Sequence, residues 1–390
     1  MTLGADFDHC SVEQVTNPFP MWKALRDHEP VARSERHGGF YVLTRYTDVR
    51  LAAQDTETFS SAGVGTGIPP QPFTLIPIDT DPPDQHDYRT IINPAFTAAA
   101  VAADEKRIRS VVVSLIEPLT RLDEFEVVSL LARPFPPMVT LSFLGFPDDV
   151  REAMTRAIDD LTHLRGLEQE RIAEASAAVL HAITVTLEAR RADPSSHRGD
   201  LLDTMLRADF QGRPLTDLEL TQLLLTLLFG AIETTATALA GSLLYLATHR
   251  DVQQRLRGQR PIPHTAVEEL IRWVSPLQAL ARTVTKDTEI GGCPLRQGDR
   301  VLLHWAAANQ DERVFPDPAV VDLERRPNKH VAFGFGPHHC VGAHLGRLML
   351  RVGLEEFLSR VGPFTVAEPS EIRWSGGEAR SLARLRLQVS

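Results

Sequence analysis

The chain has 390 residues and a formal net charge of −10 at pH 7, and 43% of its residues are hydrophobic. These values are typical of a soluble globular protein, and the acidic balance argues against nucleic acid as the main partner. The three cysteines are few, far apart and odd in number, which argues against a disulfide framework and favours a reducing cytosol.

The first sixty residues predict a mixed region of helix and strand without a targeting signal. Met1 to Ser11 lacks the basic, apolar and small-residue pattern of a signal peptide. Phe19 to His28 and Tyr46 to Ala53 have helical apolar spacing, and Phe40 to Thr44 favours a strand. The longest apolar run, Leu223 to Ile232, is too short to span a bilayer. We therefore expect a cytoplasmic protein.

Residues 60 to 83 are rich in glycine and proline but carry apolar side chains, among them Phe73 and Ile76. A long irregular segment with apolar side chains is often a functional loop, although a plain surface connection fits equally well. The acid and prolines of Asp81-Pro82-Pro83 then predict the start of a helix that carries Arg89.

The region from 97 to 210 predicts helices, because apolar residues recur every three to four positions. The expected helices are Ala98 to Leu119, Ser129 to Phe143, Asp148 to Leu164 and Glu168 to Arg191.

The longest predicted helix begins at Thr216 and runs to about Ala247 without a proline. Thr216 and Glu219 fit a capping box. A glycine and an acid–threonine pair, Glu233 and Thr234, interrupt its apolar sequence and oppose local helix propensity. Such a violation often marks function, but a helix bend with threonine bonded to a backbone carbonyl would also explain it.

The next predicted helix has a second capping-box pattern, Thr265 to Glu268, and places Glu269 and Arg272 on one face. Alone, this pair is a weak signal, since a surface ion pair contributes little. Beyond it, Thr288 to Leu303 predicts a β-hairpin that turns at two glycines, and Phe364 to Ser390 has strand character.

One stretch near the C-terminus places a single cysteine among glycines. Gly334 and Gly336 allow backbone paths that other residues resist, and Cys340 comes just before an apolar, helix-compatible run. The start of a helix favours a thiolate, which suits a soft or borderline metal such as haem iron. A buried cysteine in a glycine-rich turn is the simpler alternative.

The whole string F-x-x-G-x-x-x-C-x-G, formed by Phe333, Gly336, Cys340 and Gly342, closely resembles the haem-binding signature of the cytochrome P-450 family. His338, two residues before the cysteine, is what bacterial members usually carry. The stretch from 230 to 235 resembles the family's oxygen-activation motif, and the pair on the later helix resembles its E-x-x-R helix.

The resemblance implies a mainly α fold with a smaller β part, a triangular helical prism around a buried haem. It implies a single catalytic domain over residues 1–390. The α-rich core is expected at about 81–275 and 340–362, and the β-rich parts at about 30–60, 280–303 and the C-terminal strands.

The resemblance also implies a role for each matching residue. Cys340 is the expected ligand of haem b iron, and Glu233 and Thr234 the expected proton-delivering pair. The expected haem-binding residues are Arg89, Gln85, His86, Arg282, His338, Phe333, Gly334, Ala231 and Gly342. The expected substrate pocket consists of Phe73, Ile76, Leu227, Gly230, Leu277 and Leu280. The expected structural group is Glu269 and Arg272 with Arg325 or Arg326. Family members usually have histidine where this chain has Gln85, so the sequence leaves open whether Gln85 or His86 contacts a propionate.

The activity implied is a soluble, bacterial-type monooxygenase that hydroxylates or epoxidises a small, largely apolar molecule in secondary metabolism or catabolism. The chain lacks a flavin or nicotinamide motif, so ferredoxin and ferredoxin reductase are the expected electron donors. The expected docking charges are His339, His344, Arg347 and Arg351. Two alternatives remain open: a peroxygenase, aryl-coupling or nitrating haem-thiolate enzyme, and a non-catalytic haem sensor.

Overall fold

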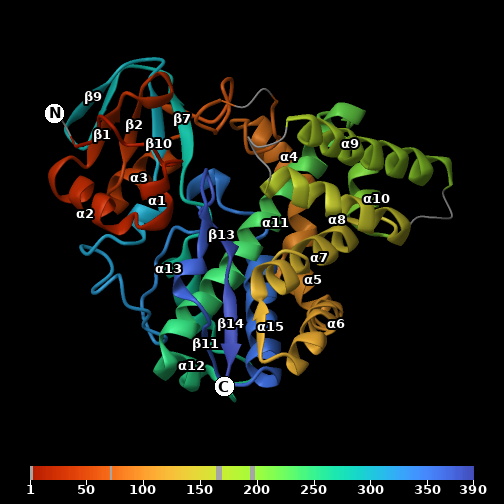
Figure 1. Cartoon of the computed structure of the whole chain (residues 1–390). Helices are drawn as coiled ribbons and strands as arrows, with labels where there is room; N and C mark the ends of the chain where they lie inside the picture. The colour runs from red at the N-terminus through yellow and green to blue at the C-terminus, as the bar shows by residue number, and fades with distance from the viewer. Residues whose placement is uncertain (1–2, 71–72, 164–168, 194–197) are drawn as a thin grey trace. The chain divides into compact units, whose positions relative to one another are not determined.

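The computed structural model describes residues 3–70, 73–163, 169–193 and 198–390, and the chain forms two compact units (Figure 1). Unit 1 comprises Met1–His86, Gln259–Ala343 and Trp374–Leu382. Unit 2 comprises Asp87–Gly258, His344–Arg373 and Ala383–Ser390. Each unit is therefore assembled from segments that are far apart in the sequence.

A five-stranded sheet forms the centre of unit 1, in the order β1-β2-β10-β7-β3. Its strands are β1 (Val31–Ser34), β2 (Phe40–Leu43), β3 (Phe59–Ser60), β7 (Leu280–Val284) and β10 (Arg300–Leu303). β10 pairs with β2 in parallel and with β7 antiparallel, with Val301 between Tyr41 and Arg282. The sheet thus joins the N-terminal segment to the segment around residue 290.

Alternate residues of this sheet enter two apolar cores, as the two-residue period of a strand requires. Val31, Leu43 and Val301 pack with α3 (Tyr46–Gln54) on one face. Ala32, Val42 and Leu302 pack on the other face with Phe7. Both faces are therefore covered, and the sheet is a rigid base for the loops that leave it.

The remaining elements of unit 1 are short. They are α1 (Val12–Thr16), α2 (Phe19–His28), η1 (Arg36–Gly38), α13 (His264–Val274), β8 (Thr288–Ile290), β9 (Cys293–Leu295), α14 (Trp305–Ala308) and η6 (Gly336–His338). β8 and β9 form the predicted hairpin, whereas β10 joins the large sheet. The predicted capping box at Thr265 is wrong, because α13 begins one residue earlier and its N-cap, Pro263, has no side chain that can accept a hydrogen bond.

Helices dominate unit 2. They are α5 (Ala98–Ala103), α6 (Glu105–Ile116), α7 (Phe135–Leu144), α8 (Asp148–His163), α9 (Gln169–Ala192), α10 (Leu201–Leu206), α11 (Asp217–Thr248) and α12 (Arg250–Leu256), with short turns η2 (Asn93–Phe96), η3 (Glu117–Arg121), η4 (Val128–Ala132) and η7 (Pro369–Glu371). α4 (Asp84–Ile92) and α15 (Ala343–Arg360) also lie mostly in this unit. The helices expected from Asp148 and up to Arg191 are confirmed as α8 and α9, except that Leu164 and Glu168 lie outside the described residues. The helix expected over Ala98 to Leu119 is divided into α5, α6 and the start of η3, and the one expected over Ser129 to Phe143 is divided into η4 and α7.

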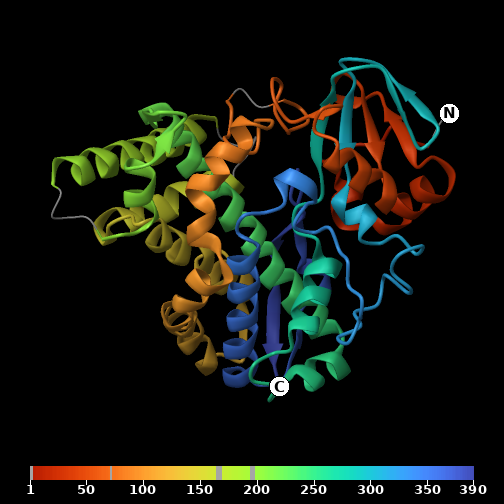
Figure 2. The ribbon, with the colours of Figure 1, turned by 180° about the vertical axis from the view of Figure 1, so that it is seen from behind.

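α11 is the central helix of unit 2, and its prediction from sequence is confirmed. Thr216 and Glu219 form the predicted capping box, and the helix contacts α7, α9, η4 and β11 (Phe364–Val366). α15 packs beside it (Figure 2): a side chain at Gly353 would come within 3.3 Å of Leu239 Cδ1. A side chain at Gly353 would therefore require the Leu239 side chain to shift by a few tenths of an ångström, so the two helices pack closely here.

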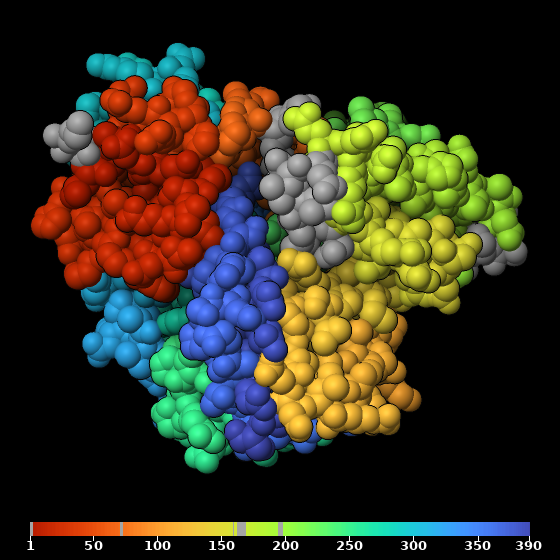
Figure 3. All heavy atoms as spheres, in the orientation of Figure 1, coloured from red at the N-terminus to blue at the C-terminus, as the bar shows by residue number. Residues whose placement is uncertain are grey.

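Small sheets complete the fold. β11, β14 (Arg386–Val389) and β4 (Glu124–Glu126) form an antiparallel sheet in the order β11-β14-β4. The blue C-terminal residues accordingly lie beside the golden residues around β4 on the surface (Figure 3). Two-stranded pairs are formed by β5 (Asp209–Phe210) with β6 (Arg213–Pro214), and by β12 (Arg373–Ser375) with β13 (Ser381–Arg384).

Among the described residues, two helices, α9 and α11, are long and apolar enough to cross a membrane by length and composition. The apolar window of α11 is 56% buried within the protein, and that of α9 is 33% buried. This is weak evidence for a membrane, because the core helix of a soluble protein passes the same test.

Candidate functional site

Cys340 lies in a tight loop three residues before α15. Its backbone N–H donates to the carbonyl of Phe333 at 2.8 Å, and the N–H of His339 donates to that of Gly336 at 3.0 Å. The Cys340 side chain is exposed, and it is not in a disulfide. The unpaired N–H groups at the start of a helix favour negative charge, so this position suits a thiolate ligand.

Two glycines make the loop possible. Gly334 and Gly336 both have φ of 71°, in the left-handed region that side chains disfavour. A side chain at Gly336 would also come within 2.6 Å of the Ala53 carbonyl oxygen at the end of α3. The cysteine loop therefore lies directly against α3, and only glycine fits there.

Side chains from two other segments of unit 1 brace the same loop. Gln85 is buried and its Nε2 donates to the carbonyl of Pro337 at 2.8 Å. His338 Nε2 lies 3.2 Å from Ser61 Oγ, and the backbone N–H of Ser61 donates to Asp81 Oδ1 at 2.8 Å. The structure thus gives Gln85 a contact with the cysteine loop, whereas His86 is exposed.

Arg282, on β7, is a buried cation with few partners. Its side chain is 1% exposed, and its one described hydrogen bond runs from Nη1 to the adjacent Ala281 carbonyl at 2.8 Å. Nε has no hydrogen-bond partner among the described residues. Burial lowers the pKa of Arg282 to about 10, although the charges of Asp79 and Asp81 oppose this shift. Such a guanidinium suits an anionic group supplied from outside the protein.

Sequence reasoning missed a second arginine in this part of unit 1. Arg300, on β10, donates to the carbonyls of Gly65 and Gly67 at 2.8 Å each and to Thr283 Oγ1 at 2.7 Å. It therefore ties the start of the 60–83 loop to the sheet. An arginine at the start of an apolar strand was the only signal in the sequence that could have indicated it.

In unit 2, α11 carries the acid–threonine pair without a break in the helix. Thr234 Oγ1 donates to the Gly230 carbonyl at 2.6 Å, the backbone bond that the simpler alternative expects. Glu233 is half-buried. Gly230 is exposed, and a side chain there would meet no described atom within 4 Å. The helix is thus regular but leaves open space on the turn that precedes Thr234.

The E-x-x-R pair forms a buried ionic cluster. Glu269 and Arg272 are both 0% exposed and are joined by two hydrogen bonds of 2.8 Å. Glu269 also accepts hydrogen bonds from Arg325 Nε and Asn328 Nδ2, each at 3.0 Å. Of the two arginines that the sequence offered as the third member, the structure brings Arg325 to the pair. The cluster lies deep in unit 1 and has the character of a folding element.

The other expected residues occupy varied environments. Arg89 is half-buried on α4 and donates to Asn93 Oδ1 at 3.3 Å. Phe73 is 47% exposed, so its side chain lies largely in solvent. The buried or half-buried members of the expected haem and substrate sets are Ile76, Leu227, Ala231, Leu277, Leu280, Phe333 and Gly342.

Comparison with known proteins identifies the family. The family model described as Cytochrome P450 matches residues 36–371. Cytochrome P450 130 of Mycobacterium tuberculosis is 35% identical, over 96% of this chain and 95% of that protein. The steroid C26-monooxygenase of Mycolicibacterium smegmatis is 32% identical, over 90% of this chain and 87% of that protein. The structure of cytochrome P450 CYP109Q5 from Chondromyces apiculatus superimposes with a TM-score of 0.88 at 31% identity, over 99% and 98% of the two chains.

The chain therefore belongs to the cytochrome P450 family, has its fold, and is a cytochrome P450 monooxygenase whose cofactor is haem b. Its residues fit that cofactor. An exposed thiol near a helix start suits the iron, and the unpartnered Nε of a buried arginine suits a carboxylate such as a haem propionate.

Proposed function

We propose that this monooxygenase inserts one oxygen atom of O2 into a small, largely apolar organic substrate by hydroxylation or epoxidation. The observation that carries the proposal is the conformation of the Cys340 loop. The left-handed backbone of Gly334 and Gly336 and the hydrogen bond from Gln85 hold the loop so that the exposed sulfur of Cys340 lies near the start of α15. A sensor would need such a ligand too, but the acid–threonine pair on α11 favours an enzyme.

In this proposal Cys340 would bind the haem iron through its thiolate, and Arg282 and His338 would hold the propionates. When bound, haem supplies the activation of oxygen, and a thiolate ligand favours cleavage of the O–O bond. The hydrogen bonds of the loop fix the position of the sulfur. A propionate would accept a hydrogen bond from the buried Nε of Arg282, which has no partner among the described residues. Binding of haem would therefore remove the free-energy cost of this unsatisfied donor.

Glu233 and Thr234 are proposed to deliver protons. A hydroxyl that donates to a carbonyl of its own helix can rotate to donate elsewhere, and the carboxyl of Glu233 can resupply its proton. The space beside Gly230 leaves room for a water molecule or another small molecule at this turn. Neither residue needs to form a covalent bond for this role.

An apolar substrate is supported by the expected pocket residues, since Ile76, Leu227 and Leu280 are buried aliphatic side chains. Relatives named steroid C26-monooxygenase and mycinamicin IV hydroxylase/epoxidase, at 32–34% and 30% identity, support the same reaction class. The exposed Phe73 has the weakest case as a pocket residue.

Electrons are proposed to come from a ferredoxin and its reductase. His339 and His344 are exposed and Arg347 is half-buried, so they can contribute to docking an acidic partner. Arg351 is a poor member of this set. Its guanidinium donates to Glu105 at 2.6 Å and to Glu355 at 2.9 Å, and these carboxylates offset its charge.

We further propose that the protein is cytoplasmic and that the whole chain is one catalytic domain. The family model spans segments of both units, which supports a single domain in sequence terms.

The experiment that tests this function compares two threonines of α11. Thr234→Ala should keep haem but divert most reducing equivalents to peroxide, because the hydroxyl that passes the proton is lost. Thr226→Ala is the matched control, since Thr226 also donates to a carbonyl one turn earlier, that of Gln222, at 2.9 Å. Product and peroxide are measured per reduced nicotinamide consumed. Equal coupling in the two variants would remove the proton-delivery role.

A further inference from the structure

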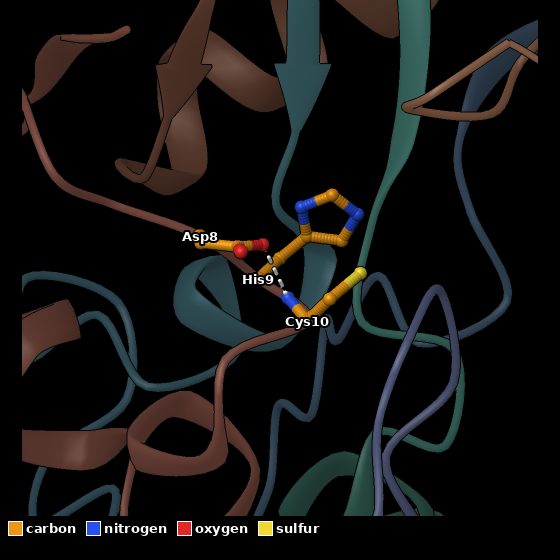
Figure 4. A group of neighbouring side chains, drawn as sticks. All are labelled: Asp8, His9 and Cys10. Atoms are coloured by element: carbon orange, nitrogen blue, oxygen red, sulfur yellow. Dashed lines mark hydrogen bonds between the residues drawn. The ribbon is translucent and has the colours of Figure 1, made fainter. Parts of the chain in front are cut away.

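The N-terminal segment of unit 1 brings together three side chains of types that can bind metals and that have no part in the proposed monooxygenase chemistry. Asp8, His9 and Cys10 are consecutive, and one ligand atom of each lies within 4.8 Å of the other two (Figure 4). Asp8 is half-buried, His9 buried and Cys10 exposed. A thiolate, an imidazole and a carboxylate together form a donor set typical of zinc sites.

His9 is the second and independent observation. Its side chain is 1% exposed, yet neither ring nitrogen makes a hydrogen bond of normal geometry among the residues that the structure describes, although the backbone of Ile68 lies near the ring as a polar neighbour. The ring packs edge-on against Phe40 and His37, at 6.0 Å between ring centroids in each case. An imidazole buried in this way needs a ligand for at least one nitrogen, because an unsatisfied buried polar group costs stability.

Asp8 is already oriented by its neighbours. Its Oδ1 accepts the backbone N–H of Cys10 at 2.9 Å and lies 3.0 Å from His37 Nε2. Contacts of this kind orient metal-binding carboxylates in many proteins. They involve Oδ1, so Oδ2 is available to a cation. His37 is therefore a positioning residue for Asp8.

The backbone that carries the three residues is attached to the large sheet. Ser34 Oγ, at the end of β1, donates to the Phe7 carbonyl at 2.7 Å, and the Glu35 N–H donates to the Ala5 carbonyl at 3.0 Å. The segment is thus held in place by the fold, with the three donor atoms within 4.8 Å of one another.

We propose that Asp8, His9 and Cys10 bind one divalent cation of the zinc class, with water completing a tetrahedral site. The cation replaces the Cys10 thiol proton, which is released to solvent, and no other bond changes. Bound there, it stabilises the N-terminal segment of unit 1 against the sheet. The site is structural and does not depend on the substrate or the electron donor.

The test is calorimetric titration of the haem-loaded protein with Zn2+, in two buffers of different ionisation enthalpy. The result expected is one Zn2+ per chain with proton release, and binding at least tenfold weaker in Cys10→Ser and in Asp8→Asn. Cys293→Ser is the matched control, because this half-buried cysteine lies outside the cluster. It should bind Zn2+ like the original chain.

Two results would overturn the proposal. One is stoichiometric binding that survives Cys10→Ser. The other is binding that Cys10→Ser abolishes but Asp8→Asn and His9→Gln leave unchanged, which would mean adventitious binding by an exposed thiol. Circular dichroism of each variant separates lost binding from lost folding, and the exposed Cys10 is the substitution least able to disturb the fold.

Discussion

Two arginines of unit 1 are equally buried but differ in what surrounds them. Arg272 is 0% exposed and its guanidinium makes two hydrogen bonds to Glu269 and others to the carbonyls of Asn309 and Pro318. Arg282 is 1% exposed, and its described hydrogen bonding consists of one contact to its neighbour's carbonyl. The chain itself supplies several hydrogen-bond acceptors to Arg272 but only one described acceptor to Arg282.

This difference is what we expect between a residue that stabilises the fold and a residue that is proposed to bind haem. A buried charge destabilises a fold unless partners compensate it, and Arg272 has those partners within the chain. Arg282 has the charges of Asp79 and Asp81 nearby but makes one described hydrogen bond, so an added anionic group would stabilise its charge further. The two residues do not differ in burial. They differ in how many of their guanidinium N–H groups donate hydrogen bonds within the chain.

The largest effect on stability is expected when Arg272, the arginine with several partners in the chain, is replaced. Arg272→Ala leaves the Glu269 carboxylate buried with one fewer cation, which should lower the free energy of unfolding by about 3–5 kcal/mol. Urea denaturation measures this, and we expect poor yield of folded protein. Arg272→Lys should recover little, because an ammonium cannot reproduce the two-bond geometry. Stability like that of the original chain in Arg272→Ala would contradict a folding role.

A smaller effect, on haem retention and not on folding, is expected when Arg282 is replaced. Arg282→Gln should weaken haem retention by about 1.5–3 kcal/mol, the range for a hydrogen bond to a charged group. The rate of haem transfer to a scavenging apoprotein measures this. Arg300→Gln is the matched control. Arg300 Nε also has no hydrogen-bond partner among the described residues, but its Nη atoms donate to carbonyls and a hydroxyl of the chain, so this substitution should affect stability more than haem loss. Equal haem loss from the two variants would remove the distinction.

A third buried basic group, His304, is expected to make the stability of the fold depend on pH. Burial lowers the pKa of His304 to about 3, so the folded protein keeps this ring neutral where the unfolded chain, with a pKa near 6.5, takes up a proton. The unfolded state therefore binds more protons between these values, and stability falls as the pH drops from 6.5 towards 3. The expected loss is about 1.4 kcal/mol for each pH unit well below 6.5.

His304→Asn tests this pH dependence. Asparagine can still accept the Ala307 N–H that His304 Nδ1 accepts at the start of α14, so the helix cap is kept. The variant should lose stability by a constant amount at neutral pH but show a shallower decline in acid. Parallel pH profiles of unfolding for the two proteins would mean that His304 does not titrate in this way.

The sequence alone predicted features whose signal lies within a few neighbouring residues or repeats over many helical turns. The cysteine loop, the capping box at Thr216 and the helix that follows were predictable, because their signals lie within a few residues or persist over many turns. The pairing of Glu269 with Arg272 was also predictable from helical spacing, but only the resemblance to a family indicated that Arg325 joins them.

The rest depends on contacts between distant segments, which one sequence does not record. Gln85 reaches a carbonyl 252 residues later in the chain, and Arg300 reaches the 60–83 loop across the sheet. The hydrogen bond from Arg351 to Glu105, 246 residues earlier in the chain, was likewise not predictable from the sequence. The second capping box failed because Pro263 already sets the helix start.

The most direct measurement is the absorption spectrum of the dithionite-reduced, carbon-monoxide-bound protein, recorded beside that of Cys340→Ser. A strongly red-shifted Soret band in the original chain, absent in the variant, is the result expected if the Cys340 thiolate is the axial ligand. An unshifted band in folded, haem-loaded protein, or a red-shifted band that survives the substitution, would contradict the assignment of Cys340 and the proposal built on it.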